Sequence, residues 1–301
     1  MLTRTVQRPI PGRETSDGAG VRLRRSLGQA PSTRLDPFLM LDEFASNDPA
    51  DYVAGFPPHP HRGFETVTYM LEGHMRHEDH LGSRGELRSG GVQWMSAGRG
   101  IVHSEMPQQE SGRMHGFQLW INLPAAEKMK PASYRDIPAA QIPTVTLKQG
   151  VVAKVIAGTL RAALDGGGDD GDAALVGGVA GPIQGLTTDP LVVDLALPRD
   201  ARFVALVPAN YAACLYVYAG TIAVGSNAVG VDRQHVEVHT AAALSDGERI
   251  EIQAGDQDAH LLLLVARPLR EPIVQYGPFV MNTRVQIDQA IADFSSGAFA
   301  A

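Results

Sequence analysis

The sequence predicts an all-β fold in two halves, each an antiparallel sandwich or barrel, with one short helix near the C terminus. Three observations predict it. Glycine and proline interrupt the first half about every ten residues, and β-rich runs lie between them. The second half repeats this style. Helical periodicity is convincing only at the end of the chain, so alternating strand–helix units are not expected.

The strands predicted in the first half are short and are bounded by turn residues. They comprise residues 64–71, 75–80, 90–95, 101–105 and 114–123. Residues 123–143 hold four prolines and are interpreted as an irregular crossover or linker. The second half is predicted to contain strands at 191–197, 202–208, 215–224, 231–238, 249–254 and 260–266. A partly apolar face predicts a helix from Val285 to about Gly297.

A chain of 301 residues is long enough for two ordinary domains, expected at 1–140 and 141–301. The low-complexity segment 165–172 (DGGGDDGD) lies within the second. Its acidic spacing matches no ordered calcium loop, so it is interpreted as a solvated insertion.

Composition and charge narrow the classes of protein. No apolar run is long enough to span a bilayer, and the first residues lack the apolar core of a secretory signal. The single cysteine, Cys214, excludes an internal disulfide framework and favours a cytoplasmic location. Seven arginines lie in the first 34 residues, but the net charge is −7 and no aromatic residues interleave with them. Direct nucleic-acid binding is therefore not expected.

Two pairs of side chains carry the candidate chemistry. His59 and His61 are two residues apart, and so are His103 and Glu105. Residues i and i+2 of a strand point to the same face, so two such pairs on neighbouring strands would converge on one point. Three imidazoles and a carboxylate suit Fe, Mn, Ni, Co, Cu or Zn, and an inward-pointing Glu105 is costly without a cation.

The other histidines carry weaker signals. His74, His77 and His80 follow a turn at residues 72–73 and are interpreted as part of a solvated hairpin. His115 begins a strand of unknown parity. Glu65 shares the strand parity of His59 and His61, so it is either a further ligand or an acceptor for the ring N–H of a liganding histidine.

Four stretches make the sequence resemble the pirin family of two-domain cupins. They are DPFLMLDEF (36–44), HPHRGFETVTYMLEG (59–73), QWMSAGRGIVHSEMP (93–107) and YGPFVMNT (276–283). Residues 55–73 and 91–105 also resemble the first and second cupin motifs. The resemblance covers essentially the whole chain and implies a bicupin, with two cupin-type antiparallel β-barrels and a short C-terminal helix.

The resemblance also implies the ligand set. The family's three histidines and one glutamate correspond to His59, His61, His103 and Glu105, whereas Glu65 falls outside the ligands. The second half has no H-x-H pair, and residues 210–225 (NYAACLYVYAGTIAVG) are apolar there. The C-terminal barrel is therefore expected to lack metal.

Some pirins are similar to quercetin 2,3-dioxygenases, which implies Fe(II)-dependent opening of a flavonol ring with O2. Glu105 would then be both ligand and general base, and Arg62 would steady the developing anion. An apolar lining from Phe56, Met70, Trp94 and Met95 is expected. Other pirins imply an alternative, a metal-dependent regulator that binds a transcription factor or a metabolic enzyme. A structural zinc protein without activity is a third interpretation.

Overall fold

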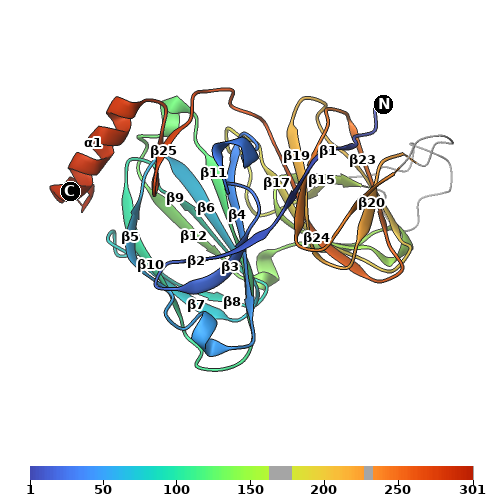
Figure 1. Ribbon diagram of the computed structural model, residues 1–301, viewed down its shortest axis with the longest axis horizontal. Helices are drawn as coiled ribbons and strands as arrows, with labels where there is room; N and C mark the ends of the chain where they lie inside the picture. The colour runs from blue at the N-terminus through green and yellow to red at the C-terminus, as the bar shows by residue number, and fades with distance from the viewer. Residues whose placement is uncertain (163–177, 227–232, 301) are drawn as a thin grey trace. The chain divides into compact units, whose positions relative to one another are not determined.

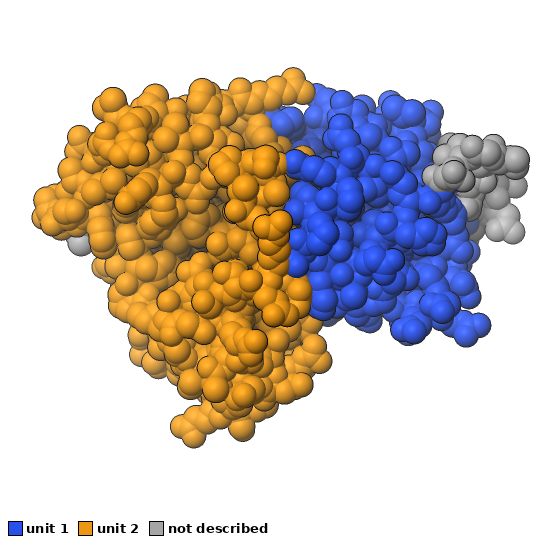
Figure 2. All heavy atoms as spheres, in the orientation of Figure 1, with its two compact units in different colours: residues 1–12, 140–268 blue, residues 13–139, 269–301 orange. Residues whose placement is uncertain are grey.

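The computed structural model describes residues 1–162, 178–226 and 233–300. The chain divides into two compact units, which Figure 2 colours separately. Unit 1 consists of residues 1–12 and 140–268, and unit 2 of residues 13–139 and 269–301. The expected insertion at 165–172 lies outside the described residues, as do the first two residues of the strand predicted at 231–238.

Unit 2 is built from two antiparallel sheets. The larger sheet has the order β12-β9-β6-β11-β4-β3-β2, and the smaller has the order β5-β10-β7-β8 (Figure 1). The strands are β2 (Arg13–Asp17), β3 (Val21–Arg25), β4 (Phe38–Ser46), β5 (Phe56–His61), β6 (Phe64–Glu72), β7 (His74–Asp79), β8 (Arg84–Arg88), β9 (Val92–Ser96), β10 (Ile101–Pro107), β11 (Met114–Asn122) and β12 (Ser133–Ile137). Strands β25 (Val274–Tyr276) and β26 (Phe279–Met281) and helix α1 (Arg284–Ser295) complete the unit.

Unit 1 repeats the two-sheet design. Its sheets have the orders β1-β22-β19-β24-β17-β14-β13 and β16-β15-β18-β23-β20-β21. The strands are β1 (Val6–Pro11), β13 (Thr144–Thr146), β14 (Val152–Ala157), β15 (Thr159–Ala162), β16 (Val179–Ala180), β17 (Leu191–Leu197), β18 (Arg202–Leu206), β19 (Ala212–Ala219), β20 (Ile222–Val224), β21 (Gln234–Val236), β22 (Thr240–Leu244), β23 (Arg249–Ala254) and β24 (Ala259–Ala266). Short 3₁₀ turns lie at Pro31–Thr33, Pro49–Asp51, Ala125–Glu127, Ala139–Gln141, Lys148–Gly150 and Ala298–Ala300.

The all-β prediction with a C-terminal helix is confirmed, with corrections in detail. The sheets are open rather than closed barrels. Strand β5 has the sequence FPPHPH and forms the edge of its sheet next to β10, since proline cannot donate a ladder hydrogen bond and is confined to sheet edges. The predicted strand 215–224 is two strands, because Gly220 turns with φ of +68°. The predicted linker contains β12, which pairs with β9.

The N-terminal residues 1–12 belong to unit 1, and the C-terminal residues 269–301 belong to unit 2. The expected boundaries at 1–140 and 141–301 place each of these segments in the other unit. Strand β1 pairs with β22 of unit 1 and buries Val6 and Ile10. Arg4 is fully buried, and its guanidinium donates hydrogen bonds to backbone carbonyls, including that of Gly247 at 2.8 Å. Helix α1 packs on β26 in unit 2, where Ile287 joins a buried cluster with Phe279. The arginine-rich N-terminal segment is thus shared between the units.

The single cysteine lies in the middle of β19 and has no exposed surface. Burial raises the pKa of the Cys214 thiol to about 12, so the thiol is unreactive and serves as a small apolar residue. In the described ranges, no helix is long and apolar enough to cross a membrane.

Candidate metal centre

The pairing of β5 with β10 brings three of the four predicted ligands together. His59 lies opposite His103 in the ladder, and His61 follows two residues later on β5. One nitrogen from each of these three imidazoles lies within 4.8 Å of the others. The convergence of the two histidine-bearing strands, inferred from residue spacing alone, is therefore present in the structure.

The three rings are oriented by local contacts. The Nδ1 atom of His59 lies 2.8 Å from the carbonyl oxygen of Pro57, so this nitrogen carries the ring proton and donates it. The Nε2 atom of His59 is then bare, and it lies 3.0 Å from the Nε2 atom of His61. The Nε2 atoms of His59 and His61 face one another, so one cation can bind to both.

Burial keeps the imidazoles of His61 and His103 neutral. His61 and His103 are each 2% exposed. Burial, followed by the neighbouring His59, lowers the pKa of His61 well below 6.5, and the Pro278 carbonyl opposes only part of this shift. Burial, followed by the adjacent imidazoles, lowers the pKa of His103 well below 6.5. Neutral imidazole is the form that binds metals, because its lone pair is free.

One buried nitrogen of the cluster, Nε2 of His103, has no hydrogen-bond partner within the part of the chain that the structure describes. An unpaired buried polar atom is costly, and an ion bound by the cluster would pair such an atom. Three imidazoles without a thiolate suit a borderline divalent metal. The residues present therefore fit a metal ion.

Glu105 shares the inward face of β10 with His103, but its carboxylate lies outside the three-histidine cluster. One oxygen accepts a hydrogen bond from the Thr68 hydroxyl at 2.9 Å. The other accepts from the Gln118 amide, also at 2.9 Å. A register shift between His103 and Glu105 accompanies this separation. The role of Glu105 as fourth ligand remains a prediction.

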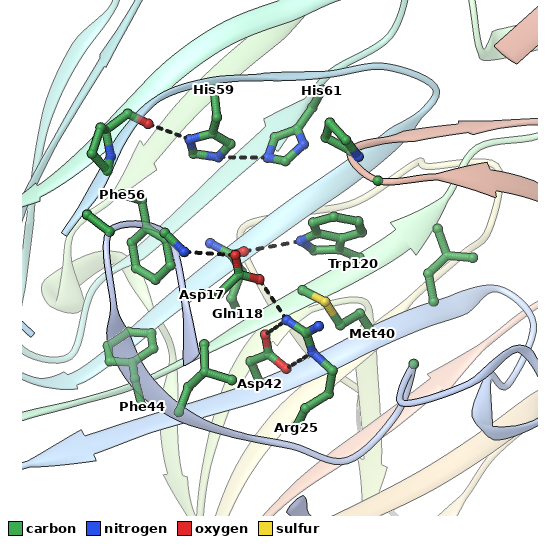
Figure 3. A pocket seen from close by; sticks show the side chains of 18 of the residues that line it. Asp17, Arg25, Met40, Asp42, Phe44, Phe56, His59, His61, Gln118 and Trp120 are labelled. Atoms are coloured by element: carbon green, nitrogen blue, oxygen red, sulfur yellow. Dashed lines mark hydrogen bonds and ion pairs between the residues drawn. The ribbon is translucent and has the colours of Figure 1, made fainter. Parts of the chain in front are cut away.

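A pocket of about 640 Å³ reaches the cluster (Figure 3). This volume falls within the range of roughly 300–1,000 Å³ that small-molecule sites occupy. Of the four residues expected to line it, Phe56 does so, whereas Met70, Trp94 and Met95 are buried elsewhere. Other lining residues are Leu39, Met40, Phe44, His59, His61, Gln118, Trp120 and Pro278.

One wall of the pocket carries charge. Arg25 on β3 forms a bidentate ion pair with Asp42 on β4, in which Nε and Nη2 of Arg25 donate to Oδ1 and Oδ2 of Asp42 at 2.8 and 2.7 Å. It also donates to Asp17 at 2.8 Å. Figure 3 places Arg25 and Asp42 at the opposite end of the pocket from His59 and His61, with Asp17 between them. The pocket thus has an imidazole end and a charged end, with aromatic side chains between them.

Glu65 does not orient an imidazole. Its carboxylate accepts a hydrogen bond from the indole N–H of Trp94 at 3.2 Å and lies 3.4 Å from the Lys130 ammonium. Burial raises the pKa of Glu65, and Lys130 and Trp94 oppose part of that shift. Its contacts therefore support neither of the roles considered for it.

Arg62 cannot serve as the anion-binding cation expected beside the site. The side chain is buried, and its Nε atom donates to the Arg99 carbonyl. Its Nη1 atom forms an ion pair with Asp293 of α1 at 2.7 Å, and the guanidinium lies 4.3 Å from the centre of the Phe299 ring. Arg62 attaches the C-terminal helix to unit 2 instead.

His77 is the residue that the sequence interpretation missed. It was assigned to a solvated hairpin, but it is 2% exposed, and its Nδ1 atom lies 3.3 Å from Nδ1 of His103. The signal was the alternation along β7, where Met75 and His77 point inward and Glu78 points outward. Gln118 gave no comparable signal, because β11 is buried on both faces.

Two antiparallel β-sandwich units, with converging histidines in one of them, define a two-domain cupin. Residues 20–121 match the model of the pirin family, and residues 192–300 match that of the pirin C-terminal cupin domain. The chain therefore belongs to the pirin family, which confirms the resemblance seen in its motifs.

Relatives match this chain along its length. “Putative quercetin 2,3-dioxygenase” of Pseudomonas aeruginosa is 50% identical over 289 residues, which are 96% of this chain and 95% of that protein. “Pirin-like protein” of Caulobacter vibrioides is 45% identical over 299 residues, 99% of this chain and 100% of that protein. The crystal structure of quercetin 2,3-dioxygenase from Acinetobacter baumannii has a TM-score of 0.85 at 31% identity, covering 99% of each chain.

Proposed function

We propose that this pirin is a metal-dependent dioxygenase that opens the ring of a flavonol with O2. The pocket of about 640 Å³ that ends on His59 and His61 carries the proposal. Its aromatic and aliphatic walls suit a flat polyphenol, and its imidazole end would place that ligand at the metal. The names of the similar Pseudomonas and Acinetobacter proteins support the same chemistry.

The proposed ligands are His59, His61, His103 and Glu105. Fe(II) is the proposed ion, because these oxygen and nitrogen donors accept it and reactions with dioxygen use it. When bound, it supplies the redox chemistry that lets a flavonolate react with O2. Mn, Ni, Co, Cu and Zn compete for such a donor set, so a purified sample can carry another metal.

Glu105 is the proposed general base and takes the proton of the flavonol 3-hydroxyl. Gln118 positions it. The indole N–H of Trp120 lies 3.2 Å from Oε1 of Gln118, which fixes the amide with its NH2 group toward the Glu105 carboxylate. Gln118 and Trp120 both line the pocket. Gln118 therefore contacts both the Glu105 carboxylate and the space in which the substrate would bind.

The reaction is balanced by the substrate and O2 alone. Both oxygen atoms enter the products, the bonds from carbon 3 to carbons 2 and 4 break, and carbon 3 leaves as carbon monoxide. The proton on Glu105 is returned to the carboxylate product. The chain's part in these steps is to bind the flavonol, deprotonate it and exclude water from it.

The test is quercetin turnover by metal-free protein reloaded with Fe(II), Mn, Ni, Co, Cu or Zn. Quercetin loss is followed by absorbance, together with O2 uptake and carbon monoxide release. We expect turnover in a one-to-one ratio of the three species, highest with Fe(II). Fully metallated protein that is no faster than free iron would reject the enzyme and favour the regulatory alternative. Activity with zinc alone would reject the redox role.

A further inference from the structure

The buried His77 lies beside the metal cluster but belongs to neither the proposed ligands nor the pocket wall. Strand β7, which carries it, pairs with β10, so Asp79 lies opposite His103 and His77 lies opposite Glu105. The Nδ1 atoms of His77 and His103 are 3.3 Å apart. One of these two nitrogens must therefore carry a proton and the other must accept it.

Asp79 decides which nitrogen that is. Its side chain has no exposed surface, and its Oδ2 atom lies 3.2 Å from Nε2 of His77. An ionised carboxylate can only accept hydrogen bonds, so Nε2 of His77 carries the ring proton. In a neutral His77 the Nδ1 atom is then bare, and it accepts the Nδ1–H of His103.

This order of donors leaves Nε2 of His103 without a proton. That nitrogen is buried and has no hydrogen-bond partner among the described residues. The ring of His103 lies 4.4 Å from that of His59 and 5.0 Å from that of His61, centre to centre. The free lone pair therefore lies on the ring edge that faces away from His77.

The ring of His77 is itself held in place. It stacks on Tyr134 of β12, with 4.2 Å between ring centres and 17° between planes. The Tyr134 hydroxyl donates to Asp136. Because the aromatic stack and the Asp79 carboxylate both constrain His77, its Nδ1 atom stays directed toward His103.

We propose that Asp79 and His77 form a hydrogen-bonded pair that fixes the Nδ1–H tautomer of His103 and so presents its Nε2 lone pair to the metal. Both are positioning residues, and neither touches the ion. The proposal rests on the proposed metal centre. It follows the general rule that a liganding histidine donates its second ring N–H to an orienting acceptor, here a second histidine.

The backbone amides around Asp79 make Asp79→Asn the substitution that tests this tautomer most directly. The Oδ1 atom accepts hydrogen bonds from the amides of Leu81 and Ser83, at 2.9 and 3.0 Å. In Asp79→Asn these two amides hold the new carbonyl oxygen at the Oδ1 position, and the NH2 group faces His77. His77 then carries its proton on Nδ1 and donates it to His103, whose own proton moves to Nε2.

We therefore expect an ordered effect on Fe(II) affinity, measured anaerobically against a competing chelator. Asp79→Asn, which stabilises the wrong tautomer, should weaken binding by about 100-fold, and His77→Phe, which only removes the acceptor, by about 10-fold. His77→Asn, which restores an acceptor near Nδ1, should recover part of the loss. Glu78→Gln, on the outward face of β7, should bind as wild type does.

A merely structural role would reverse this order, because His77→Phe is the larger change. The proposal is overturned if Asp79→Asn binds Fe(II) as tightly as wild type does, or if His77→Phe is the weaker binder of the two. Thermal unfolding of each metal-free variant identifies any that fails to fold, and the ranking then rests on His77→Phe against His77→Asn.

The tautomer can be read without any metal or turnover. Nitrogen-15 NMR of the metal-free full chain should show His103 protonated on Nδ1 and His77 on Nε2, and Asp79→Asn should reverse both. Wild type with the His103 proton on Nε2 would overturn the proposal. The expected tautomers in a chain that binds no Fe(II) would support the hydrogen-bonded pair and reject the metal centre instead.

Discussion

The two units have the same two-sheet design but fill it differently. In unit 1, β19 and β24 are lined with apolar side chains such as Leu215, Val217, Leu261 and Leu263, none of which is exposed. In unit 2, the corresponding interior contains buried histidines, carboxylates and amides, which include His61, Glu65, Gln93, His103 and Glu105. One fold therefore serves as a packed core in one unit and as a polar site in the other.

The difference shows what a functional interior costs. A buried Leu or Val side chain contributes roughly 1.5–3 kcal/mol to folding. A buried imidazole or carboxylate contributes unfavourably unless it is paired. Unit 2 pairs many of these groups with one another and leaves Nε2 of His103 for a ligand. The apolar lining of unit 1 gives stability, and it offers no comparable cluster of donors among its described residues.

The largest expected effect is the loss of metal from unit 2, which would remove the difference in metal content between the two units. His61→Ala deletes one of three converging imidazoles, so it should lose most of the metal, while wild type holds close to one equivalent per chain. His260→Ala on β24 of unit 1 is the matched control and should retain one equivalent. Elemental analysis without chelator measures this. Two equivalents in wild type would contradict the assignment of metal to unit 2 alone.

The next effect concerns the base. Glu105→Gln keeps the size of the side chain and an oxygen donor, but removes the charge. We expect quercetin cleavage to slow by roughly 10²–10⁴-fold at matched metal occupancy. The residual rate should recover as pH rises, because the flavonol then ionises unaided. Glu72→Gln, at the exposed end of β6, is the control. Equal rates in the two variants would reject Glu105 as the base.

A third substitution tests the apolar interior. Leu263→Ala should destabilise unit 1 by about 2–5 kcal/mol, because it leaves a cavity in a fully buried cluster. Metal content should stay unchanged. Urea unfolding followed by elemental analysis of the folded protein measures both quantities. Loss of metal without loss of stability would mean that the interior of unit 1 supports the site directly.

The smallest effect is the dependence of stability on pH in the metal-free protein. Burial lowers the pKa values of His61 and His103 well below 6.5, so the unfolded chain binds protons that the folded chain does not. Stability is full above about pH 6.5 and falls with further acidification, by up to about 1.4 kcal/mol per pH unit for each histidine. Urea unfolding at pH 7.5 and 5.5 measures the loss. A double His61→Leu, His103→Leu variant should lose less.

Several elements were predictable because their signals are local. The strands at Leu191–Leu197 and Arg249–Ala254 have the predicted bounds, and the terminal helix begins one residue before the predicted position. Strand β12 was not predicted, since Ser133–Ile137 has few apolar residues and is a strand because it pairs with β9. The sequence also did not predict that residues 1–12 belong to unit 1, because β1 is part of that unit through its pairing with the distant strand β22.

The sequence by itself determined the donor types and their grouping, since the i, i+2 spacing places His59 with His61 and His103 with Glu105 on common strand faces. Only the tertiary structure decided which of these side chains meet. Cross-strand register joins His59 to His103, while the Glu105 carboxylate accepts hydrogen bonds from Thr68 and Gln118. The physical reason is that strand periodicity is a local property of the chain, whereas register and burial depend on segments far apart in it.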